Sequence, residues 1–163
     1  MQLKQQLRSD LNASLKEGNQ TKRTLMGMVL TSIKNKELEK RGSLKLTDPS
    51  ELVAQSELTD DEVLDVLRKE VKKRNEAIEQ FSAAGRADLA EKEKAEANML
   101  AEYLPPAMDE SELTALVESA IVETGASSMT DMGKVMAILK SKVEGRADGA
   151  TLSSLVKKLL SRA

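Results

Sequence analysis

The stretch that decides the fold is LRKEVKKRNEAIEQFSAAGRADLAEKEKAEANMLAEYLPP, residues 67–106. On both sides of its GRAD motif, apolar residues recur at three- and four-residue spacing, which is typical of amphipathic helices. Gly85 can adopt the left-handed conformation that ends a helix, and Asp88 is suited to cap the helix that follows. The stretch therefore predicts a helical hairpin over 60–104, which the Pro-Pro pair at its end terminates.

The residues before this hairpin carry the same helical pattern. Leucines four positions apart follow 3–17, and a second apolar-periodic stretch covers 21–41, with Gly42 expected to stop it. Segment 43–58 is less regular and contains a proline, which keeps the preceding residue out of the helical region. We expect a loop there, with room for one short helical turn. At Thr59 a hydroxyl followed three residues later by a glutamate forms a capping box, which starts the long helix of the hairpin.

Beyond the prolines the pattern predicts three shorter helices, at about 110–124, 129–144 and 150–162. Asp109 and Glu112 form a second capping box at the start of the first one. The chain is therefore expected to be all-α and built in two parts. Residues 1–104 would form an N-terminal four-helix subdomain that contains the hairpin, and 107–163 a C-terminal three-helix subdomain.

The GRAD motif occurs a second time, in VEGRADGATL at 143–152. Gly145 is expected to close one helix there, and Asp148 to cap the next. The flanking residues of the two motifs differ, and their wider surroundings show no similarity. We therefore interpret both as helix–turn–helix corners rather than as copies of an internal repeat.

Composition excludes several kinds of chemistry. The 163 residues include no Cys and no His, which removes thiol chemistry, the commonest general base and the commonest metal ligand. No phosphate-binding glycine loop, dinucleotide fingerprint or nucleophile elbow occurs. We therefore predict no catalytic residues, no metal site and no cofactor. Because the chain has only two aromatic residues, we interpret five methionines as core fillers: Met26, Met28, Met99, Met132 and Met136.

Charge and hydropathy suggest the setting in which the chain works. The 25 basic and 27 acidic residues nearly balance, which argues against a strongly basic nucleic-acid binder, and no DNA partner is expected. No apolar run reaches the roughly 18–20 residues that a membrane span needs, and the first ten residues contain no hydrophobic signal segment. We expect a cytoplasmic protein with no membrane partner.

Three charged residues lie among the regularly spaced apolar residues with which the two helices of the predicted hairpin would face each other. Arg74 lies on the first arm, and Glu93 and Glu96 lie on the second arm at a matching distance from the turn. A partly buried ion pair of Arg74 with one of these glutamates would fix the register of the hairpin. The alternative is a carboxylate pair for acid/base or di-metal chemistry, but di-iron bundles normally add Glu-x-x-His motifs. We favour the structural ion pair.

The charges of the C-terminal part are strongly segregated. Residues 107–131 contain six acids and no base, whereas residues 132–163 contain seven bases and two acids, a net charge of +5. Such a cluster can bind a phosphate backbone by releasing counterions. The alternative is a solvated surface whose charges match the helix dipoles. The candidate RNA-binding residues are Lys134, Lys140, Lys142, Arg146, Lys157 and Lys158.

These motifs together resemble one protein family. The stretch quoted first, followed by TDMGKVMAILKSKVEGRADG at 130–149 and LVKKLL at 155–160, is similar to the GatB/YqeY family. The similarity covers residues 1–41 and 58–163, while segment 43–58 looks longer than is usual in the family. The resemblance implies an all-helical fold with a larger N-terminal part and a small three-helix C-terminal part. It also implies kinship to the C-terminal region of the B subunit of the tRNA-dependent amidotransferase.

The resemblance carries expectations about function. In the amidotransferase the related helical region is thought to engage tRNA, and the family label is carbon–nitrogen ligase activity with glutamine as amido donor. This chain contains only the helical region and lacks the nucleotide loop and glutaminase cysteine that such chemistry requires. We therefore expect a module that binds tRNA or assists tRNA-dependent amidation beside an amidotransferase or tRNA-charging partner, without an active site of its own. Two alternatives stay open: an enzyme component that works only with a partner, and a protein–protein adaptor that binds no RNA.

Overall fold

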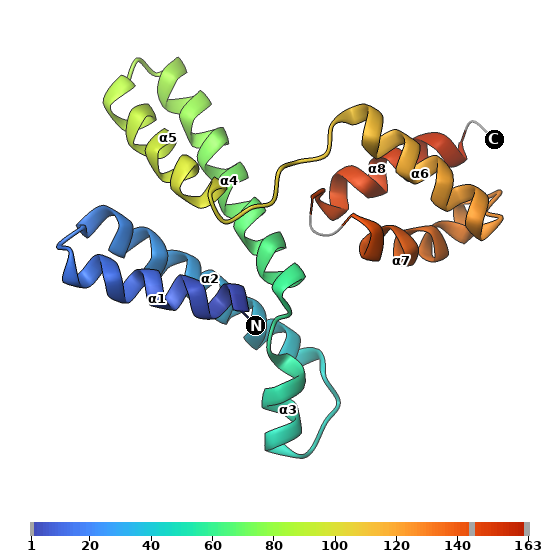
Figure 1. Cartoon of the computed structure of the whole chain (residues 1–163), viewed down its shortest axis with the longest axis horizontal. Helices are drawn as coiled ribbons and strands as arrows, with labels where there is room; N and C mark the ends of the chain where they lie inside the picture. The colour runs from blue at the N-terminus through green and yellow to red at the C-terminus, as the bar shows by residue number, and fades with distance from the viewer. Residues whose placement is uncertain (1, 144–145, 162–163) are drawn as a thin grey trace. The chain divides into compact units, whose positions relative to one another are not determined.

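The structure is a computed structural model that describes residues 2–143 and 146–161, and these residues form helices and no strand (Figure 1). The predicted all-α class is confirmed. The chain divides into two compact units, Met1–Tyr103 and Leu104–Ala163. The elements are α1 Gln2–Lys16, α2 Gln20–Ser43, α3 Pro49–Ser56, α4 Asp60–Ala83, α5 Ala87–Ala101, α6 Glu110–Thr124, the 3-10 helix η1 Met129–Asp131, α7 Met132–Lys142 and α8 Gly149–Leu160. Within the described residues, no helix is both long and apolar enough to cross a membrane.

The N-terminal unit consists of two antiparallel helical hairpins, α1–α2 and α4–α5, with the short helix α3 between them in sequence (Figure 1). Its core contains apolar faces of α2 and α4 that are buried from solvent. Val29 and Ile33 of α2 and Val63 and Leu67 of α4 are fully buried. Burying each such side chain stabilises the fold by roughly 1.5–3 kcal/mol, which is the main force that holds the two hairpins together.

Buried charges also join the elements of this unit. Lys4 of α1 forms an ion pair with Glu37 of α2, and both side chains are almost completely buried. Lys4 Nζ also lies 3.3 Å from Glu57 Oε1, and Glu37 Oε1 accepts a hydrogen bond of 3.4 Å from the backbone N–H of Leu58. The pair therefore links α1 and α2 to the segment that leads into α4. The last residue of this unit, the half-buried Tyr103, donates a hydrogen bond to the Asp10 carboxylate of α1.

The start of α4 matches the sequence prediction. The Thr59 hydroxyl accepts a hydrogen bond of 3.3 Å from Glu62 N, and the Glu62 carboxylate accepts one of 2.8 Å from Thr59 N. The capping box is therefore complete, and it satisfies two backbone donors that a helix start would otherwise leave without partners. α4 begins at the next residue, as predicted.

The first GRAD turn differs in part from the prediction. Gly85 adopts φ 71°, the left-handed conformation expected of a residue that ends a helix. However, the prediction that Asp88 caps the next helix is wrong, because α5 already begins at Ala87 and Asp88 lies in its first turn. Asp88 forms an ion pair of 3.0 Å with Arg86 instead. Its negative charge still favours the helix through the dipole at the N-terminus.

The segment that was expected to be irregular contains a helix. The Asp48 carboxylate accepts hydrogen bonds of 2.9 Å from Ser50 N and Glu51 N, and Pro49 occupies the first turn of α3, where its missing N–H has no cost. The expectation that Gly42 stops the preceding helix is wrong, because α2 continues through it to Ser43. The chain leaves the helix only at Leu44, which is extended.

The C-terminal unit packs α6, α7 and α8 around one apolar core. Val117, Val135, Leu139 and Val156 are fully buried there. The second capping box is complete: Asp109 Oδ1 accepts a hydrogen bond of 2.7 Å from Glu112 N, and Asp109 N donates one of 3.3 Å to the Glu112 carboxylate. The stretch predicted to be one helix from residue 129 begins as the 3-10 turn η1 and becomes α-helical at Met132.

The second GRAD motif lies in this unit. Asp148 caps α8 as predicted, because its carboxylate accepts hydrogen bonds of 2.9 Å from Ala150 N and Thr151 N. The predicted role of Gly145 in closing the preceding helix lies outside the described residues. The two motifs therefore use their aspartates differently, one beside an arginine in the first turn and one as a true N-cap, which agrees with independent corners rather than with a repeated unit.

Candidate functional site

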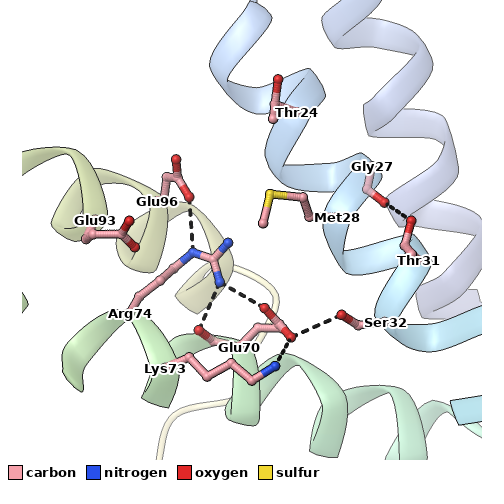
Figure 2. Close-up of a pocket in the computed structure, with 10 residues that line it drawn as sticks. All are labelled: Thr24, Gly27, Met28, Thr31, Ser32, Glu70, Lys73, Arg74, Glu93 and Glu96. Carbon is pink, nitrogen blue, oxygen red and sulfur yellow. Dashed lines mark hydrogen bonds and ion pairs between the residues drawn. The ribbon is translucent and has the colours of Figure 1, made fainter. Parts of the chain in front are cut away.

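An arginine with three hydrogen bonds occupies the interior of the N-terminal unit. Arg74 lies on the face of α4 that meets α5, and its side chain is only 5% exposed. Its Nε donates a hydrogen bond of 3.2 Å to Glu96 Oε2, across the helical hairpin. Its Nη1 donates to the backbone oxygen of Glu70 at 3.0 Å and to Glu70 Oε2 at 3.1 Å (Figure 2). The guanidinium therefore bridges two carboxylates from two helices.

Glu70 was not among the candidate residues found in the sequence, yet it is the more buried of the two partners of Arg74. It lies four residues before Arg74, the spacing at which side chains on one helix meet, and this spacing was the available signal. Glu70 Oε1 also accepts hydrogen bonds of 2.9 Å from Lys73 and 3.1 Å from Ser32 of α2. Burial favours the neutral acid, but these donors outweigh it and hold the pKa of Glu70 below its usual value.

Glu93 is not part of this network. The structure places it on α5, one turn before Glu96 and on the same side of the helix, but it forms no ion pair with Arg74 (Figure 2). Its side chain is half-buried, and no hydrogen bond or ion pair joins it to any residue that the structure describes. Of the two glutamates proposed as partners of Arg74, only Glu96 meets it.

The network forms one wall of a groove in the N-terminal unit. The groove has a volume of about 750 Å³ and is open to solvent. α2, α4 and α5 all contribute to it, through Thr24, Gly27, Met28, Thr31, Ser32, Glu70, Lys73, Arg74, Glu93 and Glu96. Met28, interpreted from the sequence as a core filler, is instead 52% exposed and reaches from α2 toward Arg74 (Figure 2). Its interpretation as part of the core was therefore wrong.

Most polar groups of the groove are engaged with one another or with the backbone. The lowered pKa of Glu70 keeps this carboxylate ionised at neutral pH, so it is not a proton donor there. Within residues 2–143 and 146–161, no group of three or more Asp or Glu side chains is arranged to hold a metal ion. The hydroxyl of Thr31 donates to the backbone oxygen of Gly27 at 2.9 Å. That of Ser32 donates to Glu70, but this carboxylate also binds Lys73 and Arg74, and its lowered pKa makes it a weak base.

The six basic residues proposed for RNA binding fall into two groups in the C-terminal unit. Three of them have acidic partners. Lys134 Nζ lies 3.1 Å from Asp131, and Lys142 forms an ion pair with Glu123.

Arg146 is the third basic residue with an acidic partner, and it joins two segments of the C-terminal unit. Its Nη2 lies 2.9 Å from the Glu112 carboxylate, and its Nε donates to Pro106 O at 3.2 Å. Its backbone oxygen accepts a hydrogen bond of 3.1 Å from Met108 N. Arg146 therefore holds the segment before α6 against the second GRAD turn, which is a structural role.

The other three basic residues, Lys140, Lys157 and Lys158, are exposed. No acidic partner is found for any of them among the described residues. Lys157 and Lys158 lie near the C-terminal end of α8, away from its buried residues Leu152, Val156 and Leu160. Among the described residues of this unit, these three lysines are the positive charges for which no acidic partner is found.

The observed corners and caps agree with the all-helical fold that the resemblance to the GatB/YqeY family implies, and the comparison with family models identifies the family. The model for the family described as "Yqey-like protein" matches residues 4–160, so the chain belongs to the YqeY-like protein family. The resemblance seen in the sequence is confirmed, and the matched range runs across segment 43–58.

Curated relatives match over parts of their length. "Uncharacterized protein C22F3.15" of Schizosaccharomyces pombe is 55% identical over 47 residues, which are 29% of this chain and 38% of that protein. "Altered inheritance of mitochondria protein 41, mitochondrial" of Pyrenophora tritici-repentis is 38% identical over 93 residues, 55% of this chain and 50% of that protein. The protein of the same name in Candida glabrata is 31% identical over 98 residues, 60% and 47% of the two chains. This chain thus spans half or less of the length of these relatives. The names of two of these relatives include the word "mitochondrial". The cytoplasmic location expected for this chain stays a prediction.

Proposed function

We propose that this chain is a helical accessory module that binds the phosphate backbone of tRNA through its C-terminal unit. The observation that carries this proposal is that Lys140, Lys157 and Lys158 are exposed and have no acidic partner among the described residues. When lysines of this kind neutralise phosphates, the cations condensed on the nucleic acid are released, and the entropy of their release favours binding. Lys134, Lys142 and Arg146 contribute less, because carboxylates already neutralise them.

The expected binding is weak and depends on salt. Three phosphate contacts would give a slope of about −2 to −3 in a plot of log affinity against log salt concentration. Phosphate contacts position a ligand without reading its sequence, so this unit by itself would discriminate poorly between tRNAs. A partner protein of the tRNA-charging or amidotransferase kind would supply selectivity, and in the amidation role it would also supply activation and ammonia.

Filter binding of purified tRNA at 20 and 150 mM salt tests the RNA contact. The double charge reversal K157E/K158E should abolish most of the retention seen at low salt. A matched reversal in the N-terminal unit, K92E/K94E, changes the net charge equally at exposed positions of α5 and should leave much more of the binding intact. If no tRNA is retained at low salt, or if both double variants lose the same amount, the proposal is wrong.

The accessory role has its own test. The chain should produce no Gln-tRNA from Glu-tRNA, ATP and glutamine by itself, and it should change the rate of that reaction when an amidotransferase is present. Unaided production of Gln-tRNA by the pure chain would contradict the absence of a self-contained active site.

One observation favours the adaptor as a second candidate. Val122 on α6 is 81% exposed, and Met129 after it is 47% exposed, so this end of the C-terminal unit presents apolar side chains to solvent. An adaptor would retain a protein partner after nuclease treatment and would lose it on V122D. Loss of the partner on nuclease treatment alone would favour the RNA-dependent role instead.

A further inference from the structure

The groove between α2, α4 and α5 holds charges that its own residues leave unsatisfied. Lys73 and Arg74 both pair with Glu70, and Arg74 also pairs with Glu96, so the charges of both cations are already compensated by carboxylates. Glu93 then remains as a carboxylate without a partner among the described residues, as does the second oxygen of Glu96. The lining of the groove therefore has one uncompensated negative charge and spare hydrogen-bond acceptors.

The groove also contains an unused donor. The Arg74 side chain is 5% exposed, and its Nη2 forms no hydrogen bond with any described residue, although Nε and Nη1 do. Figure 2 shows this nitrogen facing the open space beside Met28. A guanidinium nitrogen carries donors in a fixed plane, so an oxygen acceptor in that space would meet it with good geometry.

These two observations restrict the ligand. A phosphate or carboxylate would meet the flanking carboxylates of Glu70 and Glu96, which repel it. A free polyamine has donors for Glu93 but no acceptor for Arg74. A polypeptide with a basic side chain supplies an ammonium or guanidinium donor and, from its backbone, a carbonyl acceptor. The alkyl stem of that side chain would lie on the thioether of Met28, which is exposed in the groove.

We infer that this groove is a docking site for a partner polypeptide, which places a lysine or arginine side chain against Glu93 and Glu96 and a carbonyl oxygen on Arg74 Nη2. The volume of 750 Å³ is large enough for a few residues of such a segment. The site lies in the N-terminal unit and involves none of the lysines proposed to bind tRNA. Its test therefore succeeds or fails independently of the proposed function.

The test uses the full chain with 13C-labelled methionine methyl groups, observed by NMR during titration. The probes are the capped peptides Ac-Ala-Lys-Ala-NH2, Ac-Ala-Nle-Ala-NH2 (norleucine) and Ac-Ala-Glu-Ala-NH2, together with 1,4-diaminobutane. The lysine peptide should shift the Met28 methyl signal in a saturable way, while the buried Met26 signal stays in place. The norleucine and glutamate peptides should bind at least about fivefold more weakly, which is the factor expected for losing one partly exposed ion pair.

Two charge-removing variants complete the test. E93Q should weaken binding of the lysine peptide by about fivefold, and it should fold normally because Glu93 forms no hydrogen bond or ion pair with any described residue. The matched control E79Q removes an exposed carboxylate of α4 outside the groove and should leave the affinity unchanged. Equal binding by E93Q and the parent chain, or no saturable shift with the lysine peptide, would overturn the inference. Diaminobutane binding as tightly as the lysine peptide would overturn the assignment to a polypeptide.

Discussion

The N-terminal unit holds charged side chains in its interior, whereas the C-terminal unit keeps them at its surface. Lys4, Glu37, Glu70 and Arg74 are all buried in the first unit. The buried residues described in the second unit are apolar without exception. Removing one partner of a buried pair leaves an uncompensated charge, while an apolar core tolerates gradual change. Substitutions and acid should therefore lower the stability of the two units in different ways, and four experiments can test this.

The largest effect is expected for Arg74→Met. Glu70 and Glu96 would lose their shared cation, and Glu70 would remain almost completely buried. We expect a loss of about 4 kcal/mol in the stability of the N-terminal unit. Hydrogen exchange should show loss of amide protection in α4 and α5, with α6 to α8 unaffected. Retained protection in α4 would mean that the network does not stabilise this unit.

The counterpart in the C-terminal unit is Leu139→Ala. Leu139 is fully buried at the centre of the apolar core, so the variant loses transfer free energy and leaves a cavity. We expect a cost of about 3 kcal/mol, measured as lost amide protection in α6, α7 and α8. Ala137→Gly on the exposed side of the same helix is a control, expected to cost about 1 kcal/mol. Equal protection losses in α4 and α5 would show that the units do not unfold separately.

Acid should distinguish the two units without any mutation. The pKa values of Glu70 and Glu37 lie below the ordinary 4.5, because donors such as Lys73 and Lys4 outweigh the effect of burial. Their stabilisation is therefore present above about pH 4.5 and is lost as the pH falls through the lowered pKa values, by at most about 1.4 kcal/mol per pH unit for each carboxyl. Between pH 5 and pH 3, exchange protection should fall earlier in α2 and α4 than in α7 and α8. The reverse order would contradict the comparison.

The smallest effect is expected for Glu96→Gln. The amide oxygen can still accept the hydrogen bond of Arg74 Nε, but the negative charge is lost, and Glu70 still neutralises the arginine. We expect a loss of about 1 kcal/mol in urea unfolding. Glu76→Gln, at an exposed position of α4 with no described partner, should cost much less. Equal unfolding curves for the two variants would show that the Glu96 charge is unimportant.

Local signals in the sequence predicted the helices well. Thr59, Asp109 and Asp148 were recognised as caps because a side-chain cap depends only on residues within the same turn. Gly42 and Asp88 were misjudged for a related reason. A glycine or an aspartate near a helix end is compatible with ending or capping a helix, but the neighbouring residues decide where the helix begins or ends. Both boundaries therefore lie two residues from the predicted ones.

Contacts between helices were less predictable. Counting from the turn brought Arg74 to the level of Glu96, but it could not choose between Glu96 and Glu93, which are one turn apart on the same helix. The burial of Lys4 depends on Glu37 and Glu57, which come from other elements. In the same way, the pairing of Lys142 and Arg146 with acids of α6 removed them from the set of available cations. Such pairings follow from tertiary packing, which residue spacing within one helix does not encode.

The hydrogen bond of Tyr103 to Asp10 has a practical consequence. Tyr103 is the single tyrosine, the chain has no tryptophan, and residues 104–163 contain no aromatic side chain at all. Ultraviolet absorbance and intrinsic fluorescence above 270 nm therefore come essentially from one chromophore, and a carboxylate beside its hydroxyl makes the signal sensitive to the loss of that contact. A melting curve followed by tyrosine absorbance or fluorescence will record the first 103 residues and will not report on the last 60, so calorimetry, far-ultraviolet circular dichroism or an added tryptophan is needed to observe the whole molecule.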